Sequence, residues 1–278
     1  SFFEWPVEQW YLYHQKIQAV FKGYPTAQAA VETAVLNLWA NRRHLSLWQF
    51  FGGYRQSCPV GFSIGIKSLS ETVTEAKLHL QEGYSLIKLK GGLKLADDIQ
   101  KILKVSDLLP KSAGLILDVN HGYTFNQAKL LINKIKKSRV QLIEQPVGLT
   151  NLSALKKLHQ LSSIPIIADE SAVSLEDCQK LLLGDYVSGV NIKLMKCGGP
   201  INFLKIFHLA KSLNKIVMLG CMYESVASLT TSAQLALGLP VDYVDLDSGP
   251  IDFCDDPARG GIIYQRGRLW LGKKLIMS

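Results

Sequence analysis

Ionisable side chains stand at the ends of successive short apolar runs along this 278-residue chain. Consecutive positions are 24 to 28 residues apart, about the length of one strand followed by one helix. The spacing therefore places one chemically active group at the end of each strand in a repeated unit. In chain order these groups are Lys90, with Lys88 two residues before it, Asp118, Glu144, Asp169 and Lys193.

The three central residues of this series are carboxylates, and no His or Cys shares their spacing. Oxygen ligands without nitrogen or sulfur suit a hard cation such as Mg²⁺ and disfavour zinc. We predict that Asp118, Glu144 and Asp169 bind Mg²⁺. A single acidic residue after a strand more often caps the next helix, so the prediction depends on the ordered set.

Lysines flank the three carboxylates in the sequence. A lysine serves as acid or base near neutral pH when a neighbouring positive charge and partial burial disfavour its protonated form. Lys88 and Lys90 are two residues apart and share one side of a strand, so we expect Lys88 to tune Lys90 in this way. With Lys193, these groups predict proton removal beside a carboxylate whose developing charge a metal stabilises.

Eight aliphatic or β-branched runs must position these residues, and each is followed by an amphipathic stretch. This alternation favours a parallel sheet, and eight repeats favour a closed TIM-type barrel, at whose carboxyl face all the groups would meet. The count alone leaves an open doubly wound sheet as an alternative. The runs are Phe62 to Ile66, Leu86 to Lys90, Leu115 to Asn120, Val140 to Glu144, Ile164 to Asp169, Gly189 to Lys193, Ile216 to Gly220 and Asp242 to Asp247.

Composition excludes several other classes of protein. No zinc-finger or RNA-stacking pattern accompanies the net charge of +8, so we expect no nucleic-acid partner. No apolar run is long enough for a membrane helix, and the first ten residues do not form a secretion signal. A cytoplasmic enzyme with reduced, buried cysteines is the expectation, and a homo-oligomer is compatible with it.

The ordered motifs resemble the muconate lactonising subgroup of the enolase superfamily. The resemblance spans about residues 25 to 261 and implies a (β/α)₇β barrel in which Asp118, Glu144 and Asp169 bind Mg²⁺. Lys90 and Lys193 would face the substrate's α-carbon from opposite sides, with Asn120, Glu170 and Glu224 in supporting positions. The motifs are Leu86-Ile87-Lys88-Leu89-Lys90, Leu117-Asp118-Val119-Asn120, Ile143-Glu144-Gln145-Pro146, Ala168-Asp169-Glu170-Ser171 and Asn191-Ile192-Lys193-Leu194.

The resemblance also implies a division of the chain. Members of the superfamily usually carry an α+β cap that opens with a β-meander, whereas this sequence starts close to the cap helices. We expect a partial, mostly helical capping domain over residues 1–57 and the barrel over residues 58–261. Residues 262–278 would then return to the cap. The tail from Gly267 to Ser278 lacks the glycine-rich closing motif that is usual in the family.

The eighth run selects the reaction. Its residues Asp245 and Asp247 resemble the Asp-x-Asp signature of dipeptide epimerases, where two carboxylates suit the free ammonium of a dipeptide substrate. This resemblance implies Mg²⁺-dependent epimerisation of the C-terminal residue, with Ala-Glu as the default substrate. The alternatives are an o-succinylbenzoate synthase, an N-acylamino acid racemase, or a non-catalytic barrel remnant without its lid. An Asx-rich turn would also explain the two aspartates.

Overall fold

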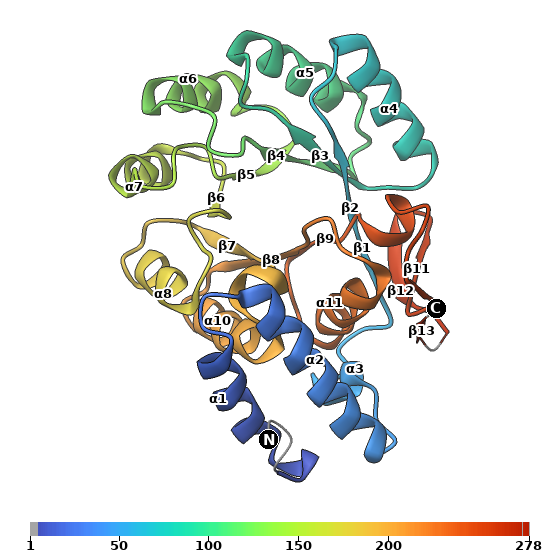
Figure 1. Ribbon diagram of the computed structural model, residues 1–278. Coiled ribbons are helices and arrows are strands. Elements are labelled where there is room, and N and C mark those ends of the chain that lie inside the picture. Colours follow the sequence, from blue (N-terminus) through green and yellow to red (C-terminus); the bar gives the residue numbers. More distant parts are fainter. Residues whose placement is uncertain (1–4, 274, 278) are drawn as a thin grey trace.

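Eight parallel strands form a nearly closed barrel in the computed structural model, which describes residues 5–273 and 275–277. Each strand pairs with the next one in the sequence, and the two end strands, β2 and β9, lie side by side (Figure 1). This sequential order confirms the predicted barrel and excludes the open doubly wound sheet. The strands are β2 (Gly61–Ile64), β3 (Leu86–Lys90), β4 (Gly114–Asp118), β5 (Val140–Glu144), β6 (Ile166–Ala168), β7 (Gly189–Ile192), β8 (Ile216–Gly220) and β9 (Tyr243–Asp245).

Helices surround the barrel and bury their apolar faces against its outer side (Figure 1). Several begin at a capping box: Ser68, Thr124 and Ser174 each accept a hydrogen bond from the third backbone N–H of the following helix. These caps explain why the helices start where they do. The helices are α4 (Leu69–Gln81), α5 (Leu95–Leu108), α6 (Phe125–Ile135), α7 (Leu152–Leu161), α8 (Leu175–Leu183), α9 (Leu194–Cys197), α10 (Pro200–Ser212) and α11 (Val226–Gly238).

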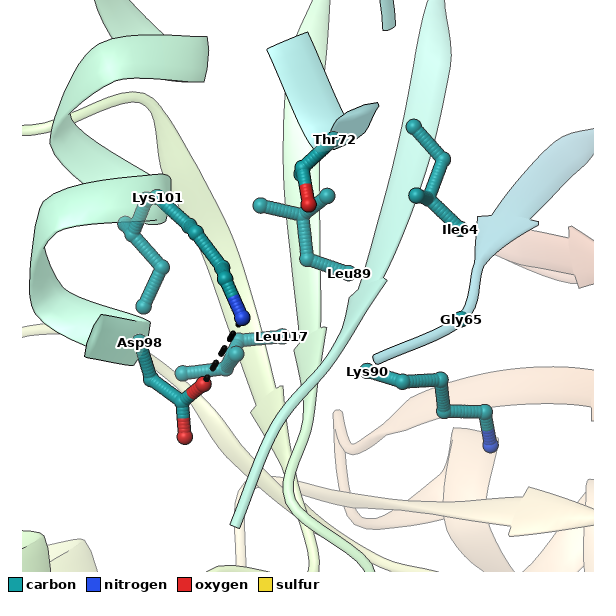
Figure 2. Close-up of a pocket in the computed structure, with 9 residues that line it drawn as sticks. Ile64, Gly65, Thr72, Leu89, Lys90, Asp98, Lys101 and Leu117 are labelled. Carbon is teal, nitrogen blue, oxygen red and sulfur yellow. Dashed lines mark ion pairs between the residues drawn. The ribbon is translucent and has the colours of Figure 1, made fainter. Parts of the chain in front are cut away.

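Strand alternation directs the charged side chains into the barrel. On β3, Leu86 belongs to a small apolar cluster with residues of β4, β5, β6 and β8, whereas Leu89 packs into the large core beneath the helices. Figure 2 shows this division: Leu89 faces α4 and α5, and Lys90 points the other way. An apolar layer therefore fills the barrel below a charged layer at the carboxyl ends of the strands.

The register of the ladder aligns three of the predicted site residues. Lys90 pairs with Asp118, and Asp118 pairs with Glu144, so the last residues of β3, β4 and β5 form one row. Asp169 and Lys193 were predicted inside strands, but each lies one residue beyond its strand, because β6 ends at Ala168 and β7 at Ile192. All five still reach the same face.

The N-terminal helices lie outside the ring of barrel helices (Figure 1). They are η1 (Val7–Gln9), α1 (Trp10–Val20), α2 (Pro25–Arg42) and α3 (Leu47–Phe50). Helix α2 packs on α9 and α10, α3 packs on α11, and Ala29 and Leu36 belong to the main core. This segment is thus joined to the barrel by shared apolar contacts. Its role as a partial capping domain stays a prediction.

The C-terminal segment forms a hairpin that pairs with β1 (Ser57–Pro59). Strands β11 (Ile262–Gln265) and β12 (Arg268–Leu271) are joined by Arg266 and Gly267, which both have positive φ, as a tight hairpin turn requires. The expectation that residues 262–278 return to the cap over residues 1–57 stays a prediction; β12 pairs with β1, which begins at Ser57, the last residue of that range. A second pair joins β10 (Ala258–Arg259) to β13 (Ile276–Met277).

Two further sequence predictions bear on the surroundings of the site. None of the helices in the described ranges has the length and apolar character needed to cross a membrane. The five cysteines are free, and Cys58, Cys178 and Cys197 are buried as predicted, whereas Cys221 is partly exposed and Cys254 is exposed.

Candidate active site at the barrel mouth

A cavity of about 410 Å³ opens at the carboxyl ends of the strands. Asp118 and Glu144 do not line it, because they are fully buried, where both pair with Lys88. Glu224 lies in the neighbouring loop after β8 and also does not reach the cavity surface. The other predicted site residues line the cavity: Lys88, Lys90, Asn120, Asp169, Glu170, Lys193, Asp245 and Asp247.

Lys88 is the central cation of the buried charge cluster. Its Nζ lies 2.9 Å from Asp118 Oδ2, 2.8 Å from Glu144 Oε2 and 2.7 Å from Asp245 Oδ2, and its side chain is 2% exposed. Burial alone would lower the pKa of Lys88, but the three carboxylates outweigh burial and raise it well above its ordinary value. Lys88 is therefore a fixed positive charge in this arrangement.

Lys90 stands at the edge of the same cluster and is the more accessible lysine of β3. Its Nζ donates to Asp118 Oδ2 at 2.6 Å and to Asn120 Oδ1 at 3.3 Å, with 31% of the side chain exposed. Burial alone would raise the pKa of Asp118, but Lys88 and Lys90 together hold it below its ordinary value. Both lysines share one oxygen of Asp118, which places two positive charges side by side, as the sequence predicted.

Lys193 and Lys196 bracket Asp169 on the other side of the barrel mouth. Lys193 Nζ donates to Asp169 Oδ2 at 2.9 Å, while Lys196 Nζ bonds Asp169 Oδ1 and the Asp169 carbonyl. Burial would lower the pKa of Lys193, but Asp169 and then Glu144 raise it above its ordinary value. The sequence predicted a lowered pKa for the catalytic lysines, but the pKa of Lys193 is raised, because carboxylates dominate its surroundings.

Glu144 is, like Asp118, a fully buried carboxylate of the cluster. Its Oε1 accepts a hydrogen bond from Asn191 Nδ2 at 2.7 Å. Its Oε2 lies near Lys88 Nζ but receives no hydrogen bond of normal geometry from the part of the chain described. Burial raises the pKa of Glu144 to about 8, although Lys88 acts in the opposite direction. A second cation beside this carboxylate would relieve a costly burial.

The carboxylates fit a hard divalent cation by their chemistry rather than by their present side-chain positions. Three buried carboxylates on adjacent strand ends form an all-oxygen donor set, and Glu144 Oε2 accepts no hydrogen bond from the residues that the structure describes. Within residues 5–273 and 275–277, however, no three acidic, His or Cys side chains are arranged to enclose a metal ion. Ammonium groups of Lys88, Lys193 and Lys196 stand between them instead.

Asp245 and Asp247 form an acidic wall of the cavity. Asp245 Oδ2 bonds Lys88, but its Oδ1 is buried and has no hydrogen-bond partner among the described residues. Asp247 Oδ2 accepts a hydrogen bond from the Ser63 backbone N–H at 2.8 Å, and burial, followed by Asp245, raises the pKa of Asp247 to about 6. Both carboxylates would gain from a further positive charge.

The supporting residues of the resemblance lie beside the charged groups. Glu170 Oε1 accepts from Asn120 Nδ2 at 2.9 Å, which links the loops after β4 and β6. Glu224 Oε1 accepts from the Met222 backbone N–H at 2.9 Å, and its own N–H donates to Ser248 Oγ at 3.1 Å. Glu224 therefore shapes the loop after β8 rather than entering the cavity.

Sequence reasoning missed three residues that hold the charged groups. Lys196 pairs with Asp169. Its position three residues after Lys193, about one helical turn, was the sequence signal that could have identified it. Gln145 is fully buried at φ 38°, and its Oε1 accepts from the Asp169 backbone N–H at 3.1 Å. Asn191 donates to Glu144 from inside β7. For Gln145 and Asn191, the only sequence signal was a position next to the last residue of a strand.

Known proteins with similar sequences and structures share one family. The family model described as "Enolase C-terminal domain-like" matches residues 71–274. The L-Ala-D/L-Glu epimerase of Clostridium acetobutylicum is 31% identical over 92% of this chain and 72% of its own length. The L-Lys-D/L-Arg epimerase of Desulforapulum autotrophicum is 32% identical over 87% and 69%. The dipeptide epimerase of Methylococcus capsulatus, solved with Mg and the dipeptide L-Arg-D-Lys, superposes with a TM-score of 0.91 at 29% identity, covering 98% and 77%.

Proposed function

The chain belongs to the enolase C-terminal domain-like family, and on that basis we propose that it is a Mg²⁺-dependent dipeptide epimerase. The relatives named above are epimerases, which places this chain among the isomerases. One observation carries the proposal: Lys90 and Lys193, on different strands, line one cavity together with the acidic pair Asp245 and Asp247. That arrangement supplies two proton carriers and an ammonium site around a single ligand.

The proposed reaction is a 1,1-proton transfer at the α-carbon of the C-terminal residue. One lysine takes the α-proton as the C–H bond breaks, and the electron pair moves onto the adjacent carboxylate, giving an enediolate. The other lysine then donates a proton to the opposite face, so atoms and charge balance. We assign Lys90 to the L epimer and Lys193 to the D epimer, with Lys88 tuning Lys90.

The metal site is proposed on the same carboxylates. Asp118, Glu144 and Asp169 would hold Mg²⁺, which supplies positive charge opposite the substrate carboxylate when bound. Lys193 needs a neutral amine to act as a base, yet Asp169 and Glu144 favour its charged form. These carboxylates must therefore be engaged by another cation before Lys193 can accept a proton.

The acidic wall supports a substrate with a free amino terminus. Asp245 Oδ1 is buried without a hydrogen-bond partner in the described structure, and Asp247 is held near it at the cavity surface. An ammonium placed between the two would satisfy both carboxylates with charge-assisted hydrogen bonds. Holding the amino terminus there would also fix the position of the α-carbon of the C-terminal residue relative to the two lysines.

The side chains of the dipeptide are a finer part of the proposal. We keep Ala-Glu as the first substrate to test, because the Clostridium relative bears that name. Cationic dipeptides belong in the same panel, since Glu170, Asp247 and Asp252 line the cavity and another relative is named for Lys-Arg. Every lysine of the cavity wall already has a carboxylate or carbonyl partner.

The test is chiral separation of products after incubation with Mg²⁺ and a panel of free and N-acetylated dipeptides. We expect conversion of an L,L dipeptide to its L,D epimer, and strong preference for the free amine. Equal turnover of the acetylated substrate would move the function to an N-acylamino acid racemase or an o-succinylbenzoate synthase. No turnover of any substrate in the panel would favour the non-catalytic remnant.

A further inference from the structure

Asp98, a buried carboxylate on α5, joins two loops at the barrel mouth without touching either proposed base. It is 3% exposed, and its Oδ2 accepts hydrogen bonds from the Gly92 backbone N–H at 2.9 Å and from the Tyr123 hydroxyl. Its Oδ1 lies 4.0 Å from Lys101 Nζ. In Figure 2, Asp98 and Lys101 face each other while Lys90 points away from both. Any effect of Asp98 on the chemistry must therefore pass through the loops.

The two loops that Asp98 joins pass so closely that they cannot move independently. A Cβ added to Gly92 would lie 2.3 Å from the Val119 carbonyl oxygen, and one added to Gly122 would lie 2.4 Å from the Gly92 carbonyl oxygen. Gly92 also has φ +103°, a conformation that other residues rarely adopt. The loop after β3 and the turn after β4 thus form one interlocked unit.

The turn after β4 carries Asn120 in a backbone conformation that needs outside support. Asn120 and His121 have φ of 42° and 55°, and such residues persist only where surrounding contacts hold them. Asn120 Oδ1 accepts from Lys90 Nζ at 3.3 Å, so the turn positions one of the two polar partners that this lysine has in the described part of the chain. Tyr123, at the end of the turn, is the residue that Asp98 binds.

We infer that Asp98 is a positioning residue for proton transfer at Lys90, because its two hydrogen bonds hold Asn120 against that lysine. The inference rests on the proposed two-lysine epimerisation. Burial, and then Asp98, raise the pKa of the Tyr123 hydroxyl, which therefore stays protonated and remains a donor. Lys193 bonds Asp169 directly, and in the described structure its side chain meets the Asn120 turn only through Glu170, which accepts from Asn120 and follows Asp169 in the chain. Asp98 consequently acts more directly on the substrate face that Lys90 serves than on the face that Lys193 serves.

The test compares deuterium exchange at the α-carbon of each epimer, measured separately in D₂O by mass spectrometry. In Asp98→Ala, exchange of the L epimer, which Lys90 serves, should fall by up to about 100-fold, the cost of a small misplacement of a catalytic group. Exchange of the D epimer with retention should change far less. Asp97→Ala, at the exposed neighbouring position on the same helix, should match the wild type for both epimers.

Two further variants separate positioning from charge and from stability. Asp98→Asn keeps an oxygen that can accept both hydrogen bonds and should retain the wild-type ratio of the two exchange rates. If Asp98→Ala fails to fold, Tyr123→Phe carries the test and should lower L-epimer exchange selectively. Equal losses for both epimers, or a loss in Asp98→Asn as large as in Asp98→Ala, would overturn the inference. Wild-type protein that exchanges neither epimer would instead refute the proposed function, and the inference with it.

Discussion

Replacing Lys88 with Met should destabilise the barrel by about 3–5 kcal/mol, the usual cost of leaving a buried charge without its partner. The Lys88 ammonium lies within 2.9 Å of three carboxylates, of which Asp118 and Glu144 are fully buried and Asp245 is 4% exposed. Met fills nearly the same volume, so the loss of packing is small. The loss of stability should therefore come from charge.

Urea unfolding followed by circular dichroism measures the loss, with Lys77→Met, an exposed lysine on α4, as the control. The control should change stability by less than about 0.5 kcal/mol, as surface substitutions usually do. Mg²⁺ should restore part of the loss in Lys88→Met, by about 2.7 kcal/mol at a concentration 100 times its Kd. A loss no larger than that of the control would refute the role of Lys88 as counter-ion to the carboxylates.

Three further predictions concern the proposed reaction. Glu144→Gln should abolish Mg²⁺-dependent activity while leaving circular dichroism unchanged, and EDTA should do the same reversibly in the wild type; full activity after rigorous chelation would contradict the metal site. Lys193→Ala should lose epimerisation but still exchange deuterium into the L epimer through Lys90, as mass spectrometry would show; equal loss for both epimers would count against the assignment. Asp247→Asn should narrow the preference for free over N-acetylated dipeptide, which in the wild type should be on the order of 2–5 kcal/mol by the ratio of kcat/KM values; an unchanged ratio would exclude Asp247 from amine recognition.

The barrel and its charged mouth could be predicted because local apolar runs mark the strands, and parallel pairing brings the carboxyl ends of all strands to one face. Val140–Glu144 and Ile216–Gly220 form strands with the predicted bounds: the second is a continuous apolar run, and the first is an apolar run interrupted only by Gln141 before its terminal Glu144. β6 is shorter than predicted because Pro165 has no N–H to donate to the ladder. The convergence of Lys90, Asp118 and Glu144 follows from in-register pairing of neighbouring strands.

The parts that could not be predicted depend on contacts between distant segments. Lys88 lies beside Lys90 on Asp118, but its side chain also reaches Asp245, which is 157 residues away in the sequence and which local spacing did not predict as its partner. The pairing of β12 with β1 joins segments that are far apart in the sequence, and no local pattern near Ser57 predicts it. Asp98 similarly shows its partners only once the loops at Gly92 and Tyr123 are folded together.

The cytoplasmic location, the oligomeric state and the identity of the dipeptide stay predictions from the sequence. The first two depend on features that the barrel mouth does not carry. The residues that do line it, four lysines and five carboxylates among them, concern proton transfer and charge. They bear directly on the proposed epimerisation, because proton transfer at the α-carbon in D₂O leaves deuterium on that carbon.

The most direct test of that claim is mass gain in D₂O. A free dipeptide incubated with the protein and Mg²⁺ should gain one deuterium, located by fragmentation at the α-carbon of its C-terminal residue and present in both epimers. EDTA should stop the gain, and added Mg²⁺ should restore it. No deuterium at that carbon for any member of a dipeptide panel, or deuterium gained equally after chelation, would contradict epimerisation by two lysines at a metal-supported site.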